Sequence, residues 1–186
     1  MQRQAALFLD RDGVVNEDRV YVHREEDFEF IDGVFDLCRH AKSLHYLIFV
    51  VTNQAGIGRG YYGEEDFHRL TRWMCERFAA QGVEVDKVYY CPFHPVHGVG
   101  KYKLDSPMRK PAPGMILQAA QEFNLDLERS VLVGDMETDI QAGVAAGVGC
   151  NLLYRAHGQT PAPSTAATRQ VGRLADVCSY LTRGAI

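Results

Sequence analysis

Short apolar runs alternate with segments of helical period along most of the chain. Five runs read as buried strands: AALFLD, YLIFVVTN, VDKVYYC, SVLVGD and CNLLY. Four segments repeat apolar residues every three to four positions, as amphipathic helices do: VFDLCRHAKSL, EEDFHRLTRWMCERFAAQ, GMILQAAQEFNL and TDIQAGVAAG. LIFVV and VLVG lack the polar alternation of a strand with one solvated face. The pattern predicts an α/β fold, a three-layer sandwich with a mostly parallel sheet between helices.

Three long segments show neither pattern. They cover about residues 13–31, 91–113 and 155–169, and a final helix is expected within the sequence GRLADVCSYL. Loops of this length inside a compact domain usually carry function or are disordered. A chain of 186 residues can bury the core of one domain, so we expect a single domain over residues 1–186, with a C-terminal loop and helix over about 155–186.

Composition and charge narrow the partners and the compartment. The formal net charge of −4 counts against a nucleic-acid binder held by phosphate neutralisation. The five cysteines contain no CxxC pair, which fits a reducing compartment better than a disulfide framework. No apolar segment is long enough to span a bilayer, and no signal-like segment opens the chain. We therefore expect a cytoplasmic protein that binds neither nucleic acid nor membrane.

Polar residues that can carry chemistry stand where the apolar runs end. Ligands of open parallel sheets bind beyond the carboxyl ends of the strands, so these residues should meet. Residues two apart in a strand project to the same side, so the first two aspartates are expected to converge. The residues concerned are Asp10, Asp12, Thr52, Asn53, Asp135 and Asp139, together with Arg109 and Lys110 after the long loop.

Aspartates gathered at one point repel each other unless a cation compensates them. Magnesium prefers oxygen ligands and commonly binds through one or two carboxylates plus a substrate phosphate. Lys110 and the hydroxyl of Thr52 can then stabilise a phosphoryl group. Asp10 can attack phosphorus, and Asp12 can protonate the leaving alcohol and later deprotonate water. The set favours phosphoryl transfer.

Each of these motifs alone has a plainer interpretation. An aspartate pair after a strand often belongs to a loop or a helix cap, and Thr52 and Asn53 are common turn residues. A basic pair before a proline is often solvated, and Asp135 can cap a helix whose dipole favours Asp139. Their joint occurrence, in this order and each at a strand end, favours a functional site.

These residues resemble the four motifs of the haloacid dehalogenase superfamily: DRDG, VVTN, RKP and GDMETD, within about residues 5–154. Inside that superfamily, the stretches FLDRDGVVN, DFEFIDGV, VVTNQAGIGRG, YYCPFHP, RKPAPGM and VGDMETDIQAG are similar to the heptose-bisphosphate phosphatases, and histidinol-phosphate phosphatases share many of them. The resemblance implies a Rossmann-like domain without a large cap, a magnesium cofactor and an aspartyl-phosphate intermediate.

The resemblance also implies roles for individual residues. Asp10, Asp12, Thr52 and Lys110 correspond to catalytic residues. Asp10, Asp135 and the backbone carbonyl of Asp12 correspond to metal ligands, with Asp139 behind them. The residues expected to bind substrate are Arg11, Asp18, Arg19, Val20, Tyr21, Asn53, Gln54, Ala55, Arg59 and Arg109; among them, Arg19, Arg59 and Arg109 carry charges that suit a second phosphate.

The sequence departs from the family pattern at two places. Relatives commonly hold a structural zinc through Cys-x-His and Cys-x-Cys, whereas here Cys91 remains and Phe93, Ser106 and Met108 occupy the other positions. Zinc needs four nitrogen or sulfur ligands in such a site, so no structural zinc is expected and the loop should be ordered by packing. His94 and His97 are read as ordinary loop residues. Met136 stands where many relatives have lysine, which is expected to weaken a contact to the far end of the substrate.

The expected activity is that of a magnesium-dependent phosphoric monoester hydrolase acting on a small sugar bisphosphate. The particular reaction expected is removal of the 7-phosphate of a heptose 1,7-bisphosphate, for ADP- or GDP-heptose in lipopolysaccharide or capsule. Histidinol phosphate is the alternative substrate, and a binding module without turnover is the alternative class. A protein without a large cap is compatible with a monomer. The preferred anomer is left open.

Overall fold

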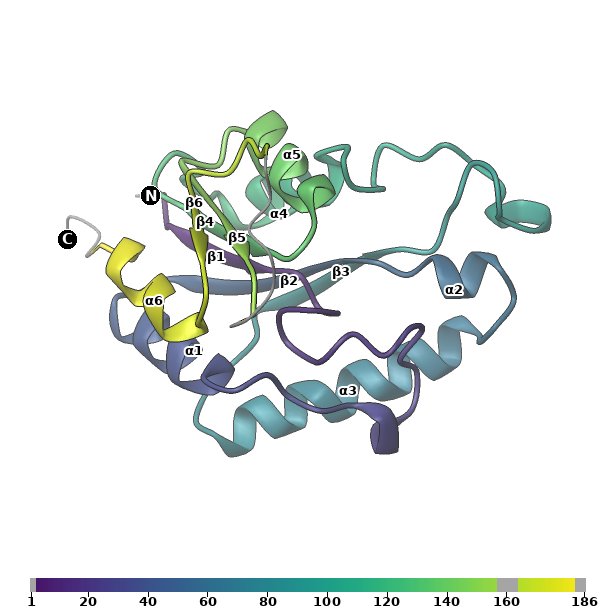
Figure 1. The fold of residues 1–186 in the computed structure, drawn as a ribbon, viewed down its shortest axis with the longest axis horizontal. Coiled ribbons are helices and arrows are strands. Elements are labelled where there is room, and N and C mark those ends of the chain that lie inside the picture. The colour runs from purple at the N-terminus through teal and green to yellow at the C-terminus, as the bar shows by residue number, and fades with distance from the viewer. Residues whose placement is uncertain (1–2, 157–163, 183–186) are drawn as a thin grey trace.

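The computed structural model describes residues 3–156 and 164–182. Its centre is a sheet of six parallel strands in the order β3-β2-β1-β4-β5-β6. The strands are β1 (Ala6–Leu9), β2 (Leu47–Asn53), β3 (Lys87–Cys91), β4 (Val131–Gly134), β5 (Cys150–Tyr154) and β6 (Arg169–Val171). All carboxyl ends of the strands therefore face the same edge of the sheet (Figure 1).

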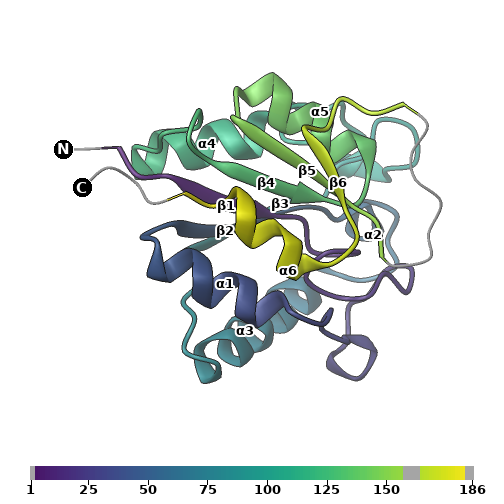
Figure 2. The same cartoon turned by 60° about the vertical axis from the view of Figure 1, so that its left-hand side comes forward.

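Helices cover both faces of this sheet. Figure 2 shows α1, α3 and α6 on one side and α4 and α5 on the other. Their bounds are α1 (Val34–Ser43), α3 (Glu64–Ala80), α4 (Gly114–Phe123), α5 (Glu137–Ala146) and α6 (Leu174–Val177), and a short α2 (Ala55–Gly58) follows β2. The predicted three-layer α/β sandwich is confirmed, and no large cap domain is inserted within the described ranges.

The strands are buried on both faces because their residues alternate between two cores. On β1, Leu7 and Leu9 face the core under α1 and α3, while Ala6 and Phe8 face the core under α4 and α5. All four side chains are fully buried. This burial explains why the strand sequences are continuously apolar.

The observed elements differ from the predicted ones at their margins. The five predicted strands and five predicted helices are present, the final helix as the short α6, and the ends of the others are shifted by at most two residues; α2 and β6 were not predicted. Each is only three or four residues long, too short for its period to be distinguished from loop sequence. The predicted C-terminal loop lies partly in residues 157–163, outside the described residues. Among the helices described, none has the length and apolar character needed to cross a membrane.

The direction of chain winding reverses between two strands. From β1 the chain builds the sheet outward through β2 and β3, and it later returns to the other side of β1 with β4, β5 and β6. β1 and β4 are therefore neighbours that lead into loops on opposite sides. A crevice forms at such a switch point, which is where open α/β sheets bind ligands.

Candidate active site

Three carboxylates meet beyond the ends of β1 and β4. Asp10 follows β1, Asp135 follows β4, and Asp139 lies in the first turn of α5. One oxygen from each lies within 4.8 Å of the others. The approach is close because Gly134 has no side chain: a Cβ there would lie 2.2 Å from the Cβ of Asp139. The predicted meeting of the strand ends is thus observed for these three residues.

Lys110 is inserted among these carboxylates. Its Nζ lies 2.9 Å from Oδ1 of Asp10 and 2.6 Å from Oδ1 of Asp139, and it donates to the carbonyl of Val51 at 2.8 Å. Burial opposes the charged form, but the two carboxylates outweigh it and raise the pKa of Lys110. A single buried cation therefore faces three carboxylates.

The excess negative charge shows in the pKa values of two aspartates. Burial, and then the nearby carboxylate of Asp139, raises the pKa of Asp10 well above its ordinary value. The same two causes raise the pKa of Asp135 to about 7. Oδ1 of Asp135 is also buried without a hydrogen-bond partner. A divalent cation would lower both pKa values and take up this orphaned oxygen.

The donor set fits magnesium. It offers only oxygen ligands, and Mg²⁺ binds through few carboxylates while keeping several waters. The close approach of Gly13 completes the site, because a Cβ at residue 13 would lie 2.2 Å from Oδ2 of Asp135. Gly13 also has a φ of +89°, in the left-handed region that favours glycine.

Asp12 follows Asp10 by two residues and is held by its own set of partners. β1 ends at Leu9, so the alternation of a strand does not extend to Asp12, and its carboxylate is not a member of the described cluster. Oδ1 accepts from Arg11 at 2.8 Å and from Asn16 at 3.1 Å, and Oδ2 accepts from Gln54 at 3.0 Å. The carboxylate of Asp12 is therefore held separately, beside the acidic cluster.

Arg11 is buried. Its Nη2 also donates to the carbonyl of Val22 at 2.7 Å, and the guanidinium lies 5.9 Å from the ring centre of Phe67. Only 1% of the residue is exposed. In this structure Arg11 contacts Asp12 and the 13–31 segment, and its predicted substrate contact stays a prediction.

Thr52 and Asn53, at the end of β2, face different parts of the site. Asn53 exchanges two hydrogen bonds with the backbone of Lys110, both at 3.0 Å, and so fixes the loop that carries the third motif. Oγ1 of Thr52 accepts from Nε2 of Gln54 at 2.9 Å, which leaves its hydroxyl hydrogen able to donate. Ala55 begins α2, and its carbonyl accepts from the amide of Arg59 at 2.9 Å.

The predicted substrate residues of the 13–31 segment form an exposed turn. Oδ1 of Asp18 accepts from the amide of Val20 at 3.1 Å, and Arg19 is ion-paired with Glu29. Val20 and Tyr21 both have positive φ values, of 54° and 62°. Such backbone strain in two successive non-glycine residues is typical of ligand-contacting segments.

Two arginines influence each other electrostatically: Arg109, which precedes Lys110, and Arg59, which caps the end of α2. Nη1 of Arg109 donates to the carbonyl of Phe93 at 3.3 Å. Burial lowers the pKa of Arg109, and the charge of Arg59 adds to the effect, so the two guanidiniums lie near each other. Burial and then Arg109 lower the pKa of His94 as well. Nε of Arg59 is buried without a partner. Arg59 and Arg109 thus form a cationic pair.

The 91–113 loop is held by side chains at the positions where the resemblance led us to look for zinc ligands. Phe93 and Met108 pack against the core under α4, and Oγ of Ser106 accepts from the amide of Met108 at 3.2 Å. Nδ1 of His94 accepts hydrogen bonds from the backbone amides of residues 96 and 97. The donor set does not fit a closed zinc site.

A tyrosine and glutamate clamp fastens this loop to α3. Tyr90 donates to Oε2 of Glu64 at 2.7 Å, and Tyr102 donates to Oε1 of the same residue at 2.5 Å. Because Tyr102 lies in the middle of the loop, the clamp fixes the segment that leads to Arg109 and Lys110. It was not predicted, because its members are 26 and 38 residues apart in the chain.

Sequence reasoning also missed Tyr62, His23 and Asn16, all of which contact the site through other residues. Tyr62 donates to Gln54, His23 stacks on Tyr62, and Asn16 donates to Asp12. The only sequence signal was their position close to the first and second motifs.

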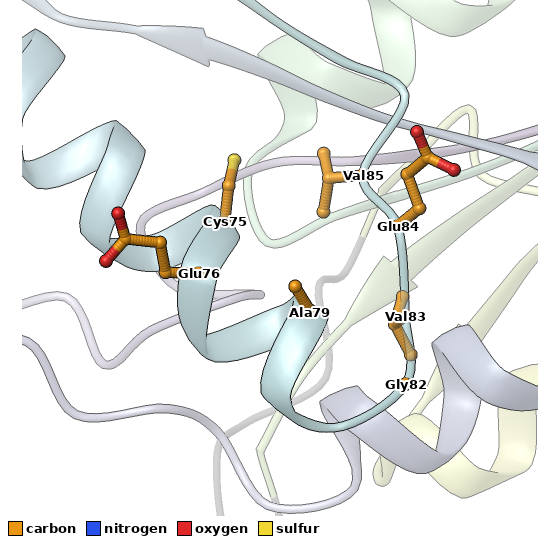
Figure 3. Close-up of a pocket in the computed structure, with 7 residues that line it drawn as sticks. All are labelled: Cys75, Glu76, Ala79, Gly82, Val83, Glu84 and Val85. Atoms are coloured by element: carbon orange, nitrogen blue, oxygen red, sulfur yellow. The ribbon is translucent and has the colours of Figure 1, made fainter.

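The structure also contains a cavity that lies away from this site. A cavity of about 610 Å³ lies between the end of α3 and the segment leading into β3, at the amino edge of the sheet. Figure 3 shows its lining, in which the carboxylates of Glu76 and Glu84 are directed away from each other and from Cys75. It contains no residue of the acidic cluster. A second cavity, of about 270 Å³, adjoins Asp135 and is also lined by Asp18 and Tyr154.

An acidic cluster with one buried lysine, at the switch point of a parallel sheet, is the arrangement expected from the four motifs. The HAD-hydrolase-like family model matches residues 107–181, which include Lys110, Asp135 and Asp139. The fold and site thus define a HAD-like hydrolase.

Comparison with known proteins narrows this class. The chain is 55% identical to D-glycero-alpha-D-manno-heptose-1,7-bisphosphate 7-phosphatase of Burkholderia mallei, covering 97% of this chain and 95% of that protein. It is 48% identical to D-glycero-beta-D-manno-heptose-1,7-bisphosphate 7-phosphatase of Vibrio cholerae, covering 96% of each. A crystal structure of D,D-heptose 1,7-bisphosphate phosphatase from B. bronchiseptica, complexed with magnesium and phosphate, has a TM-score of 0.81 at 28% identity, covering 96% of this chain and 98% of that one. The chain belongs to the D-glycero-D-manno-heptose-1,7-bisphosphate 7-phosphatase family.

Proposed function

We propose that this chain is a magnesium-dependent phosphatase that removes the 7-phosphate of D-glycero-D-manno-heptose 1,7-bisphosphate. The observation that carries the proposal is the contact of Lys110 with Asp10, 2.9 Å apart in a buried cluster beyond β1 and β4. It sets a carboxylate nucleophile beside the cation that receives the phosphoryl oxygens. The names of the relatives supply the substrate.

In the first half of the reaction, an oxygen of Asp10 attacks phosphorus to form an aspartyl-phosphate. The bond from phosphorus to the C7 oxygen breaks, and that oxygen takes a proton from Asp12. In the second half, Asp12 removes a proton from water, which attacks the aspartyl-phosphate and regenerates Asp10 with release of phosphate. Asp12 ends protonated, ready for the next substrate. Its place beside the cluster lets it reach the leaving group.

Lys110 and Thr52 act on the transferring group. The ammonium of Lys110 and the free hydrogen of the Thr52 hydroxyl can each donate to phosphoryl oxygens, where negative charge develops in the transition state. Both residues are nearly fully buried, so these interactions act in a site of low dielectric.

We propose that Asp10, Asp135 and the backbone carbonyl of Asp12 hold the magnesium ion. When bound, Mg²⁺ neutralises the carboxylates and the phosphate so that an anionic nucleophile can approach an anionic substrate. The orphaned oxygen of Asp135 and its raised pKa support this assignment. Asp139 holds Lys110 and supports the cluster from α5.

The far end of the substrate is assigned to the cationic pair and to the exposed turn. Arg59 and Arg109 offer two positive charges to the 1-phosphate, and the turn over residues 18–21 offers polar groups to the sugar. Met136 is 55% exposed and can give that phosphate no charge-assisted contact. An imidazole amine, such as that of histidinol phosphate, would be repelled by the two arginines.

The wider setting is part of the same proposal. The product feeds activated heptose for lipopolysaccharide or capsule, and the protein acts in the cytoplasm as a single-domain monomer, without a nucleic-acid partner. The mild net negative charge supports the last point.

The test is phosphate release with Mg²⁺ from both anomers of the heptose bisphosphate, with histidinol phosphate and an aryl phosphate alongside. The proposal predicts the highest kcat/KM for one heptose anomer. A preference for histidinol phosphate would contradict the proposed substrate but would be consistent with the proposed phosphatase mechanism. No release from any of the four would support a binding module instead.

A further inference from the structure

A chain of hydrogen bonds links a buried tyrosine to the carboxylate of Asp12. The hydroxyl of Tyr62 donates to Oε1 of Gln54 at 2.5 Å. Nε2 of Gln54 donates to Oδ2 of Asp12 at 3.0 Å and to Oγ1 of Thr52 at 2.9 Å. We propose that Tyr62 and Gln54 are positioning residues that orient Asp12 for proton transfer to the leaving alcohol. The inference rests on the proposed function, which makes Asp12 the acid.

The side chain of Gln54 makes three hydrogen bonds within the protein. Both amide hydrogens and the amide oxygen have partners, and the residue is only 2% exposed. The resemblance placed Gln54 among substrate-binding residues, and that role stays a prediction; its side-chain contacts point in addition to the support of Asp12. An amide whose donors serve two groups of the site at once fixes their relative position.

Tyr62 decides which way the amide of Gln54 points. If the amide were turned over, its oxygen would face the carboxylate of Asp12, and two acceptors would oppose each other. Tyr62 favours the observed orientation because it donates to that oxygen, and burial raises its pKa so that the phenol stays protonated. Without the hydroxyl, Oε1 would be buried and unpaired, a cost that the amide can relieve only by rotating away from Asp12.

The two oxygens of Asp12 differ in their support. Oδ1 is held by Arg11 and by Asn16, which leave it little capacity for another partner. Among residues 3–156 and 164–182, Oδ2 accepts a hydrogen bond from Gln54 alone, and the side chain is 23% exposed. Oδ2 is therefore the oxygen that can exchange a proton with substrate, and its direction depends on Gln54.

Tyr62 is itself fixed by two neighbours. Its ring lies against Gly56, where a Cβ would be 2.2 Å from Cε1 of the tyrosine. The ring of His23 stacks on the ring of Tyr62 at a centroid distance of 4.9 Å and an interplanar angle of 1°. His23 belongs to the 13–31 segment, so the same contacts tie that segment to the orientation of Asp12.

The test uses Tyr62→Phe and two substrates that differ in their need for an acid. The C7 oxygen of the heptose must be protonated as it leaves, whereas 4-nitrophenolate leaves without a proton. The parameter kcat/KM covers only the steps up to departure of the leaving group, so the later role of Asp12 as a base does not enter. We expect kcat/KM to fall about tenfold or more for the heptose bisphosphate and to stay within about twofold for 4-nitrophenyl phosphate.

Two further variants make the result specific. Tyr89→Phe removes the hydroxyl of another buried tyrosine, which donates to Glu122 on α4, away from the site, and should leave both values unchanged. Asp12→Asn should show the same selectivity as Tyr62→Phe, with a larger loss on the heptose bisphosphate. Thermal unfolding of each variant reports its stability separately.

An equal loss on both substrates in Tyr62→Phe would assign the tyrosine a structural role only and overturn the inference, as would no loss on either. The proposed function fails by a different result. If Asp12→Asn retains wild-type turnover of the heptose bisphosphate, or the wild-type protein has none, then Asp12 is not the acid, and the inference falls with it.

Discussion

Nζ of Lys110 lies 2.6 Å from Oδ1 of Asp139, and both side chains are only 3% exposed. Oδ2 of Asp139 accepts a hydrogen bond from the backbone amide of Met136 at 2.9 Å. The start of α5 therefore holds the carboxylate of Asp139 in place, and that carboxylate in turn holds Lys110. The lysine then contacts Asp10 from a defined direction. The first turn of α5 thereby positions a side chain that comes from the end of a long loop.

Lys110→Met should abolish turnover and also weaken the fold. It leaves Asp10 and Asp139 buried without their cation, and removing one partner of a buried ion pair costs about 3 to 5 kcal/mol. The measurement is urea unfolding at pH 8 without Mg²⁺. Lys87→Met is the matched control, because Lys87 is 43% exposed and paired with Glu122 near the surface. It should cost about 1 kcal/mol or less. Equal losses would contradict the role of the buried cluster.

The raised pKa of Asp135 predicts how stability varies with pH when Mg²⁺ is removed. The unfolded chain ionises this group near its ordinary pKa of 3.8, whereas the folded protein does so only near pH 7. The folded state is therefore favoured by this group below pH 4, and that advantage is lost as the pH rises toward 7 and beyond. Between pH 5 and pH 8 the loss is about 3 kcal/mol, and it is nearly complete once the pH exceeds 7.

Asp135→Asn should remove that part of the pH dependence. Urea unfolding in chelator at pH 5 and pH 8 should show a smaller fall in stability for Asp135→Asn than for the wild type. Added Mg²⁺ should stabilise the wild type at pH 8 and have little effect on Asp135→Asn. Identical pH profiles for the two proteins would show that the folded state does not raise the pKa of Asp135.

Gly13→Ala should impair magnesium binding. The new Cβ would lie 2.2 Å from Oδ2 of Asp135, so either the loop or the carboxylate must move. Gly60→Ala is a suitable control: its φ of +76° imposes similar backbone strain, but no atom lies within 4 Å of the added Cβ. We expect the Mg²⁺ concentration for half-maximal activity to rise about tenfold or more in Gly13→Ala and to change little in Gly60→Ala. A similar rise in both would assign the effect to backbone strain.

The 91–113 loop should keep its structure without zinc. Packing of Phe93 and Met108 and the clamp of Tyr90 and Tyr102 on Glu64 hold it. Purified protein should therefore contain no stoichiometric zinc by elemental analysis. After treatment with chelator, Mg²⁺ alone should restore full activity. One tightly held zinc per chain would contradict this.

Much of the fold and the centre of the site could be predicted because they depend on local patterns. Continuous apolar runs identified the five longer strands, and the rule that ligands bind at carboxyl ends pointed to Asp10, Asp135 and Lys110. β6 was missed because three residues carry no detectable period. Strand alternation was the argument for bringing Asp12 to Asp10, and it does not apply because the chain leaves the strand at Leu9; the convergence of the two carboxylates stays a prediction.

The supporting contacts could not be predicted from sequence. The residues that hold Asp12 and the 91–113 loop are joined by side-chain hydrogen bonds between segments that only the fold brings together. Gln54 and Tyr62 are typical of this group: each is an ordinary polar residue near a motif, and only the three contacts of one amide reveal its role. Similarly, nothing in the sequence distinguishes the buried Arg11 from an exposed arginine.

The most direct test of the central claim is ³¹P NMR of D-glycero-D-manno-heptose 1,7-bisphosphate incubated with Mg²⁺ and either the wild type or Asp10→Asn. The account predicts that the wild type converts the 7-phosphate signal into inorganic phosphate while the 1-phosphate signal persists. It also predicts no conversion by a folded Asp10→Asn protein. Loss of the 1-phosphate, or comparable conversion by Asp10→Asn, would contradict it.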